Sequence, residues 1–188
     1  MNRLILIYIL YLFCDFALFA EELQTPKLFL GYDLGEKFTY HHRVMDYFEH
    51  VTEAANHVNL VRYGITYEGR PLVYAVITHP SNKKSIKTIR TNHLIRSGLM
   101  QGQKPRQDLV VVWLSYSVHG NESSSTEAAM KTLYDFADIN NENTMDWLKK
   151  TVVIIDPCIN PDGRDRYCLL YTSPSPRDAT LSRMPSSA

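Results

Sequence analysis

The chain has 188 residues, of which 45% are hydrophobic and 21% are charged, a composition typical of one globular domain with a sizeable core. Twenty basic residues balance twenty acidic residues, so net charge offers no attraction for a nucleic-acid partner. The sequence therefore favours a protein without a nucleic-acid partner, and it does not specify an oligomeric state.

Residues 1–20 have the pattern of a secretory signal peptide. Arg3 precedes a short apolar core, and Ala20 precedes a polar break. A charged residue, Asp15, interrupts the apolar run, so neither half is long enough to span a bilayer. We expect an exported protein, secreted or periplasmic, with no stable membrane span after signal removal. Lipoprotein anchoring through Cys14 is disfavoured, because the small residues that such processing requires do not precede it.

The first elements after the signal are a helix and a β-hairpin. Residues 39–56 show helical spacing, and residues 59–65 and 72–78 are β-branched and aromatic runs separated by a turn, which predicts a hairpin. A surface helix is expected at 85–97. The inward face of the first helix is predicted to carry Val44, Tyr47, Phe48, Val51 and Ala55.

Two uninterrupted apolar runs, at 109–114 and 151–155, each predict a strand that is buried on both faces. A helix at 124–139 and a short helical segment at 145–150 lie between them. The inward face of the longer helix is expected to carry Ala128, Leu133 and Phe136. This order predicts an α/β protein, a mixed sheet with helices on both faces, which is incomplete at the C-terminus.

Residues 169–188 do not fit a folded domain, because they are rich in Ser and Pro and lack periodicity. One interpretation is a disordered tail. We favour a foreign tail, similar to translated sequencing-adaptor DNA, because the domain before it stops in mid-fold.

His119 and Glu122 lie just beyond the end of the first apolar run. Open α/β sheets bind ligands beyond the carboxyl ends of their strands, and an imidazole with a carboxylate suits Zn²⁺. The spacing alone is a weak signal, since His50 and Glu53 repeat it inside the first helix, where we interpret them as an ordinary surface pair. For His119 the alternative is a loop histidine bonded to backbone.

A second motif, Asn160-Pro-Asp-Gly163, follows the second apolar run and is interpreted as a turn. The joint pattern of strand, His-x-x-Glu, helix, strand and Asn-Pro-Asp-Gly resembles the carboxypeptidase A-like zinc carboxypeptidase family. Residues 34–39 and 67–72 are similar to the opening of such a domain, so the resemblance covers about residues 25–167.

The resemblance implies a partial catalytic domain over residues 25–168, with Zn²⁺ as cofactor and peptides as substrates. It implies that His119 and Glu122 are the first two zinc ligands. Arg166 or Arg164 would help to stabilise the oxyanion, with Arg166 preferred; the alternative for both is a solvated loop arginine. No histidine follows His119, so the third ligand, the glutamate base and the residues for the substrate carboxylate are expected further downstream.

The function implied is a zinc metallocarboxypeptidase that hydrolyses the C-terminal peptide bond. The 188-residue chain itself is expected to be inactive, because two ligands hold zinc poorly. Two alternatives remain within the same fold: an N-acyl amino acid amidohydrolase, and an inactive relative that binds peptides or cell-wall fragments. A third is that the open sheet edges prevent stable folding.

Overall fold

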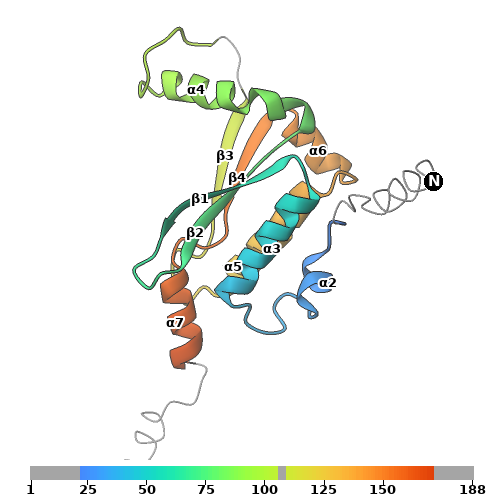
Figure 1. Cartoon of the computed structure of the whole chain (residues 1–188), viewed down its shortest axis with the longest axis vertical. Helices are drawn as coiled ribbons and strands as arrows, with labels where there is room; N and C mark the ends of the chain where they lie inside the picture. Colours follow the sequence, from blue (N-terminus) through green and yellow to red (C-terminus); the bar gives the residue numbers. More distant parts are fainter. Residues whose placement is uncertain (1–21, 106–108, 172–188) are drawn as a thin grey trace, which may run out of the picture.

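A four-stranded sheet in the order β1-β2-β4-β3 forms the centre of the computed structural model (Figure 1). The structure describes residues 22–105 and 109–171, so the expected signal peptide at 1–20 lies outside the described residues. Within those two ranges, no helix combines the length and the hydrophobicity needed to cross a membrane.

The predicted hairpin is confirmed. β1 (Val58–Ile65) pairs with β2 (Pro71–Thr78) in antiparallel fashion. A register shift between Arg62 and Gly64 marks a bulge in β1. The turn between the strands is closed by the Thr66 carbonyl, which accepts the Gly69 N–H at 3.0 Å.

The two apolar strands differ in their surroundings. β4 (Thr151–Asp156) lies between β2, to which it is antiparallel, and β3 (Val110–Ser115), to which it is parallel. β4 is almost fully buried, as predicted. β3 is the last strand of the described sheet, with Val110 60% and Trp113 65% exposed. The prediction of burial on both faces is therefore wrong for β3. An apolar run shows that a strand prefers burial, but its place in the sheet depends on the topology.

Helices α3 (His41–Ala54) and α5 (Ser124–Ala137) pack against each other and cover one face of the sheet (Figure 1). The short helix α2 (Pro26–Leu30) lies against both of them. All five side chains predicted on the inward face of the helix at 39–56 are buried, although Ala55 follows the end of α3. They join the β2 and β4 side chains on this face in one hydrophobic core.

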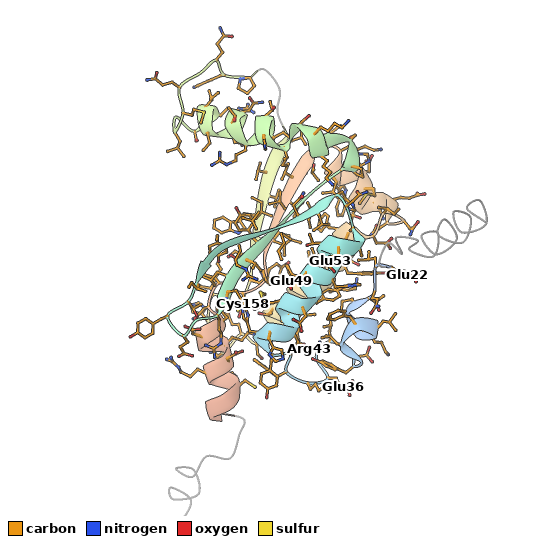
Figure 2. All side chains as sticks on the ribbon, in the orientation of Figure 1. Glu22, Glu36, Arg43, Glu49, Glu53 and Cys158 are labelled. Atoms are coloured by element: carbon orange, nitrogen blue, oxygen red, sulfur yellow. The ribbon has the colours of Figure 1, made fainter. Side chains whose placement is uncertain are left out.

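His50 belongs to this buried face as well. It is only 4% exposed, and its Nε2 accepts the Gln24 N–H at 3.1 Å. Its ring lies 5.1 Å from the Phe29 ring, measured between centroids. Glu53 is exposed on the same helix (Figure 2). The interpretation of His50 and Glu53 as a surface pair is therefore wrong, because α2 and the preceding segment extend the buried surface of α3.

The inward face of α5 also differs from the prediction. Leu133 is buried and Phe136 is partly buried, but Ala128 is exposed and its neighbour Glu127 is buried. Because adjacent helical residues are separated by about 100° around the axis, the N-terminal part of α5 presents a different face to the core. Glu127 is buried because the backbone N–H groups of Gly35 and Thr39 bind its carboxylate.

The other face of the sheet is covered at one end by α4 (Ile86–Arg96), which follows the 3-10 helix η1 (Pro80–Ser85). An apolar cavity of about 510 Å³ lies between α4 and the sheet. A further helix, α6 (Glu142–Leu148), precedes β4. The α/β architecture with a mixed sheet and helices on both faces is confirmed.

The Asn160-Pro-Asp-Gly motif begins a helix, so its interpretation as a turn is wrong. α7 runs from Pro161 to Tyr171. The Asn160 side-chain oxygen accepts the Gly163 N–H at 3.0 Å, and Pro161 occupies the first helical position, where its missing N–H costs nothing. α7 includes residues 169–171 of the expected tail, and residues 172–188 lie outside the described residues.

Candidate metal centre

The loops that follow β3 and β4 lie side by side, because parallel strands end at the same edge of the sheet. Three backbone hydrogen bonds join them. The Tyr116 N–H donates to the Asp156 carbonyl at 3.0 Å. In the other direction, the Ile159 N–H donates to the Tyr116 carbonyl at 3.1 Å, and the Asn160 N–H donates to the Ser117 carbonyl at 3.2 Å. The two sequence motifs are thus brought together by the backbone before any side chain contributes.

Ser117 directs the chain away from the line of β3. Its φ is 52°, in the left-handed region, and its side chain is buried. A residue other than glycine pays a strain cost there, on the order of 1–3 kcal/mol. The bend leads to Val118 and His119, whose side chains are exposed. Nothing in the local sequence indicated that a serine would make this bend.

His119 and Glu122 lie close together on the loop, as expected from their spacing. The His119 Nδ1 is 3.2 Å from the Glu122 Oε1, and the side chains are 71% and 57% exposed. The Glu122 N–H donates to the His119 carbonyl at 3.1 Å, which closes a tight turn between them. Two ligand atoms on one tetrahedral zinc ion, each about 2.0–2.2 Å from the metal, are themselves about 3.3–3.6 Å apart. The 3.2 Å contact, a hydrogen bond in this structure, is slightly shorter than that separation, so a small movement of either side chain would allow the pair to chelate a single ion.

Within residues 22–105 and 109–171, the pair has no third candidate ligand beside it. Among the described residues, no group of three or more His, Cys, Asp or Glu side chains is placed to hold a metal ion. Both side chains of the pair are exposed to solvent.

Gly120, between the two candidate ligands, packs directly against α7. A Cβ at this position would overlap the carbonyl group of Gly163 and lie 2.7 Å from the Arg164 nitrogen. The glycine is required by this close approach, and not by a positive φ, since Gly120 is not in the left-handed region.

Asn160 joins the two motifs with its side chain. While its Oδ1 caps α7, its Nδ2 donates to the Val118 carbonyl at 3.2 Å. One amide side chain therefore fixes both the start of α7 and the residue before His119. This dual role gives the joint sequence pattern a physical basis.

The two candidate arginines occupy different environments. Arg164 is 1% exposed, and its guanidinium donates to the backbone carbonyls of Thr39 and Ser123. The side chain of Arg166 is 60% exposed and pairs with Glu68 in the hairpin turn. Within the part of the chain that the structure describes, the side-chain hydrogen bonds and ion pairs of the two arginines go to Thr39, Ser123, Glu127 and Glu68, and not to His119 or Glu122.

A buried carboxylate lies behind the two loops. Asp156 accepts the Tyr63 hydroxyl at 2.7 Å and the Cys158 N–H at 3.2 Å. Burial raises the pKa of Asp156, while these two hydrogen bonds act to lower it. Burial likewise raises the pKa of the Cys158 thiol, which lies near the start of α7 (Figure 2). The Tyr63–Asp156 contact was not predictable from sequence patterns, because the two residues are 93 positions apart in the chain.

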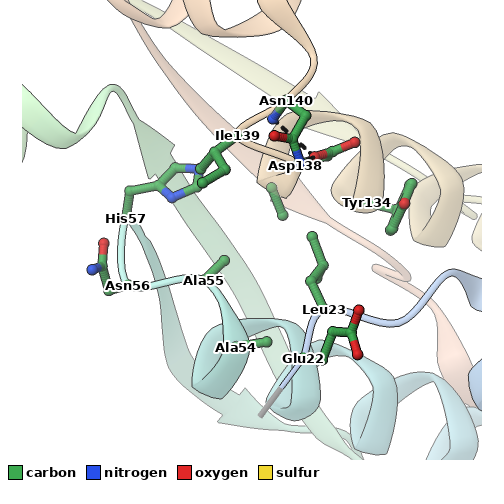
Figure 3. Close-up of a pocket in the computed structure, with 11 residues that line it drawn as sticks. Glu22, Leu23, Ala54, Ala55, Asn56, His57, Tyr134, Asp138, Ile139 and Asn140 are labelled. Carbon is green, nitrogen blue, oxygen red and sulfur yellow. Dashed lines mark hydrogen bonds between the residues drawn. The ribbon is translucent and has the colours of Figure 1, made fainter. Parts of the chain in front are cut away.

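A separate pocket of about 380 Å³ lies where α3 and α5 end (Figure 3). None of the candidate site residues lines it. Its histidine, His57, forms a hydrogen bond with the Phe136 carbonyl at 3.2 Å, and burial holds its pKa below the usual range. The pocket is therefore not part of the candidate metal centre.

The chain is similar to known carboxypeptidases. The family model described as zinc carboxypeptidase matches residues 44–176. Carboxypeptidase A from Helicoverpa armigera has 18% identity and a TM-score of 0.52, with 70% of this chain and 26% of that chain covered. Thrombin-activatable fibrinolysis inhibitor has 17% identity and a TM-score of 0.50, with 69% and 27% covered.

These likenesses concern the fold, since both identities are low. The chain spans about a quarter of the length of the two solved structures. No curated protein sequence matches it.

Proposed function

Because the chain belongs to the zinc carboxypeptidase family, we propose that His119 and Glu122 are two zinc ligands of a metallocarboxypeptidase that hydrolyses the C-terminal peptide bond of peptides. The observation that carries this proposal is the 3.2 Å separation of His119 Nδ1 and Glu122 Oε1 on a loop at the carboxyl end of β3. The interlocked Asn160 motif supports it, because it holds the backbone before His119 in place.

The residues of this chain have distinct parts in the proposed reaction. Zinc, when bound, would lower the pKa of a water molecule and polarise the scissile carbonyl. His119 would bind through a neutral imidazole and Glu122 through its carboxylate, so both must be deprotonated to act as ligands. The exposed guanidinium of Arg166 would donate to the developing oxyanion, and a substrate must compete with Glu68 for it.

Two further parts of the proposal concern the protein beyond this loop. The segment at 1–20 would direct export. The third zinc ligand, the glutamate base and the groups that bind the substrate carboxylate would come from residues other than those described. Because two protein ligands hold zinc weakly, the 188-residue chain alone would be inactive.

The ligand assignment is tested by titrating the purified chain and its variants with Zn²⁺ by isothermal titration calorimetry, and by following the His119 ring resonances by NMR wherever that histidine is present. We expect weak one-to-one binding that is lost in His119→Ala and strongly reduced in Glu122→Gln. The matched control is His42→Ala, which removes an exposed histidine from α3. Equal zinc affinity in the His119→Ala variant and the unaltered chain would contradict the assignment.

The reaction is tested with peptides that differ only in a free or an amidated C-terminus. For the protein isolated from its source with zinc, we expect release of the C-terminal residue from the free peptide alone, and loss of this release on chelation. Cleavage of an N-acyl amino acid in preference to both peptides would instead support the amidohydrolase. Zinc-dependent turnover by the 188-residue chain would contradict its expected inactivity.

A further inference from the structure

Arg164 holds the backbone at the C-terminal end of the candidate metal loop. Its Nε and Nη2 both donate to the Ser123 carbonyl, at 3.3 and 3.2 Å, and its Nη1 donates to the Thr39 carbonyl at 2.6 Å. The planar guanidinium holds its N–H donors in a fixed relative geometry. Two of these donors therefore bind the Ser123 carbonyl while a third binds the Thr39 carbonyl.

Ser123 is joined directly to Glu122 by a peptide bond. The Ser123 side chain makes no capping hydrogen bond at the start of α5. The Glu122 carbonyl accepts the Ser125 N–H at 3.1 Å and the Ser125 hydroxyl at 2.8 Å. Arg164 therefore fixes the carbonyl group of the residue next to Glu122, within a turn that Ser125 completes.

The opposite end of the same loop is held by the residue just before α7. Asn160 binds the carbonyls of Ser117 and Val118 through its backbone N–H and its side chain. Residues 117–123 are thus anchored at both ends by the segment 160–164, and Gly120 packs on Gly163 between the anchors. The backbone is fixed while the side chains of His119 and Glu122 remain exposed.

The environment of Arg164 is unusual for a cation. Burial lowers its pKa, and its nearest carboxylate, Glu127, is 3.9 Å away. Glu127 accepts instead from the backbone N–H groups of Gly35 and Thr39, at 2.7 and 3.0 Å. The Phe38 ring lies 4.0 Å from the Arg164 guanidinium carbon. Because a buried charge is costly unless it is well bonded, this side chain is suited to fixing backbone carbonyls, and a flexible ammonium could not reproduce its fork.

We propose that Arg164 is a positioning residue for zinc: by holding the Ser123 carbonyl, it keeps Glu122 in register with His119 for chelation. This inference rests on the proposed function. Residues behind metal ligands typically change metal affinity by about 10–100-fold when they are replaced. The expected effect is therefore a loss of zinc affinity of at least about tenfold without any loss of a ligand.

The test compares zinc dissociation constants of Arg164→Lys, Arg164→Met and the unaltered chain, measured from the His119 ring resonances. Arg164→Lys keeps the positive charge but loses the fork, so we expect both variants to bind zinc at least about tenfold more weakly. The control for lost stability is Leu148→Ala, which removes a buried side chain of α6. This control should unfold more easily and yet keep its zinc affinity within about twofold, since Leu148 shares no partner with the metal loop and distant sites act independently.

A second measurement uses the unaltered chain and does not depend on a variant that folds. Coupling between two sites is reciprocal, so zinc binding should slow hydrogen exchange at the Arg164 Nε–H. An Nε–H exchange rate that zinc leaves unchanged overturns the inference, as do folded Arg164 variants with normal affinity or a Leu148→Ala variant that loses as much affinity.

The outcomes separate this inference from the proposed function. If zinc binds through His119 and the Arg164 variants retain it, only the positioning role fails. If the His119→Ala variant binds zinc as well as the unaltered chain does, both proposals fail.

Discussion

The backbone of Gly120 lies directly against the backbone of Gly163, so that the two sequence motifs touch where neither has a side chain. The loop that carries His119 and Glu122 is thus seated on the first turn of α7. Side chains could not be added to this contact without moving one of the two segments.

We predict that Gly120→Ala destabilises the protein and displaces the loop. The added Cβ would meet the Gly163 carbonyl group, which is backbone and cannot rotate away. Overpacking of this kind costs about 1–3 kcal/mol. Urea unfolding would measure the loss, and a change in the His119 ring resonances would report the displacement.

Gly64→Ala is the matched control for this prediction. A Cβ on Gly64 in β1 would lie 3.7 Å from the Leu72 side chain, an ordinary contact. We expect its unfolding free energy to change by less than about 0.5 kcal/mol. Equal costs for the two substitutions would show that the Gly120 contact is not tight.

A second prediction concerns Tyr63→Phe, which removes the hydroxyl that donates to Asp156 at 2.7 Å. At neutral pH we expect the free energy of unfolding to fall by about 1–2 kcal/mol. The fall is moderate because Tyr63 is partly exposed, so water can replace part of the lost hydrogen bond. The loss should depend on pH. Burial already raises the pKa of Asp156 in the folded state above its ordinary value of 3.8, so the folded state retains a proton that the unfolded state has released.

The contribution of Asp156 to the free energy of unfolding therefore falls as pH rises from the pKa of the unfolded state through the raised pKa of the folded state. Without the Tyr63 hydroxyl the pKa of Asp156 rises further, so the cost of Tyr63→Phe should be larger at pH 7 than at pH 4. Chemical unfolding at both pH values measures this, with the fully exposed Tyr67→Phe as control. A cost that is larger at pH 4 would refute the assignment.

A third prediction compares two neighbouring strands. Ile155 in β4 is fully buried in the core, whereas Trp113 in β3 is largely exposed. Ile155→Ala should cost about 2–5 kcal/mol. Trp113→Ser should change stability by less than about 0.5 kcal/mol, although tryptophan is the larger residue. Urea titrations of both variants decide this, and a large cost for Trp113→Ser would place β3 inside a core.

Periodic features of the fold were predictable from the sequence. The inward face of α3 repeats every three or four residues, and the hairpin is marked by β-branched runs around a turn. These signals are local, since they depend on residues that are neighbours in one element. The buried position of β4 was predictable for the same reason.

Features that depend on tertiary contacts were not predictable. β3 resembles β4 in composition but lies at the end of the described sheet. His50 is buried because the segment at Gln24 covers it. The Asn-Pro-Asp-Gly motif also contains a helix-start signal, which is an asparagine cap followed by proline. The same residue types favour turns, so the motif was interpreted as a turn.

The candidate site was predictable in part. The position of His119 and Glu122 after an apolar strand, together with the Asn-Pro-Asp-Gly motif, indicated a candidate ligand pair, and the structure brings the two side chains to 3.2 Å. The contrast between Arg164 and Arg166 was not visible, because it depends on carbonyl groups from Thr39 and Ser123, which are distant in sequence.

The outer edge of β3 has a consequence for the handling of the protein. No described strand pairs with this edge, and the run Val110 to Ser115 contains no charged residue and no proline. Edge strands usually carry such residues, which discourage intermolecular strand addition. We therefore expect that, during refolding, folding of each molecule competes with intermolecular pairing through β3, and that the recovered yield falls as the chain concentration is raised.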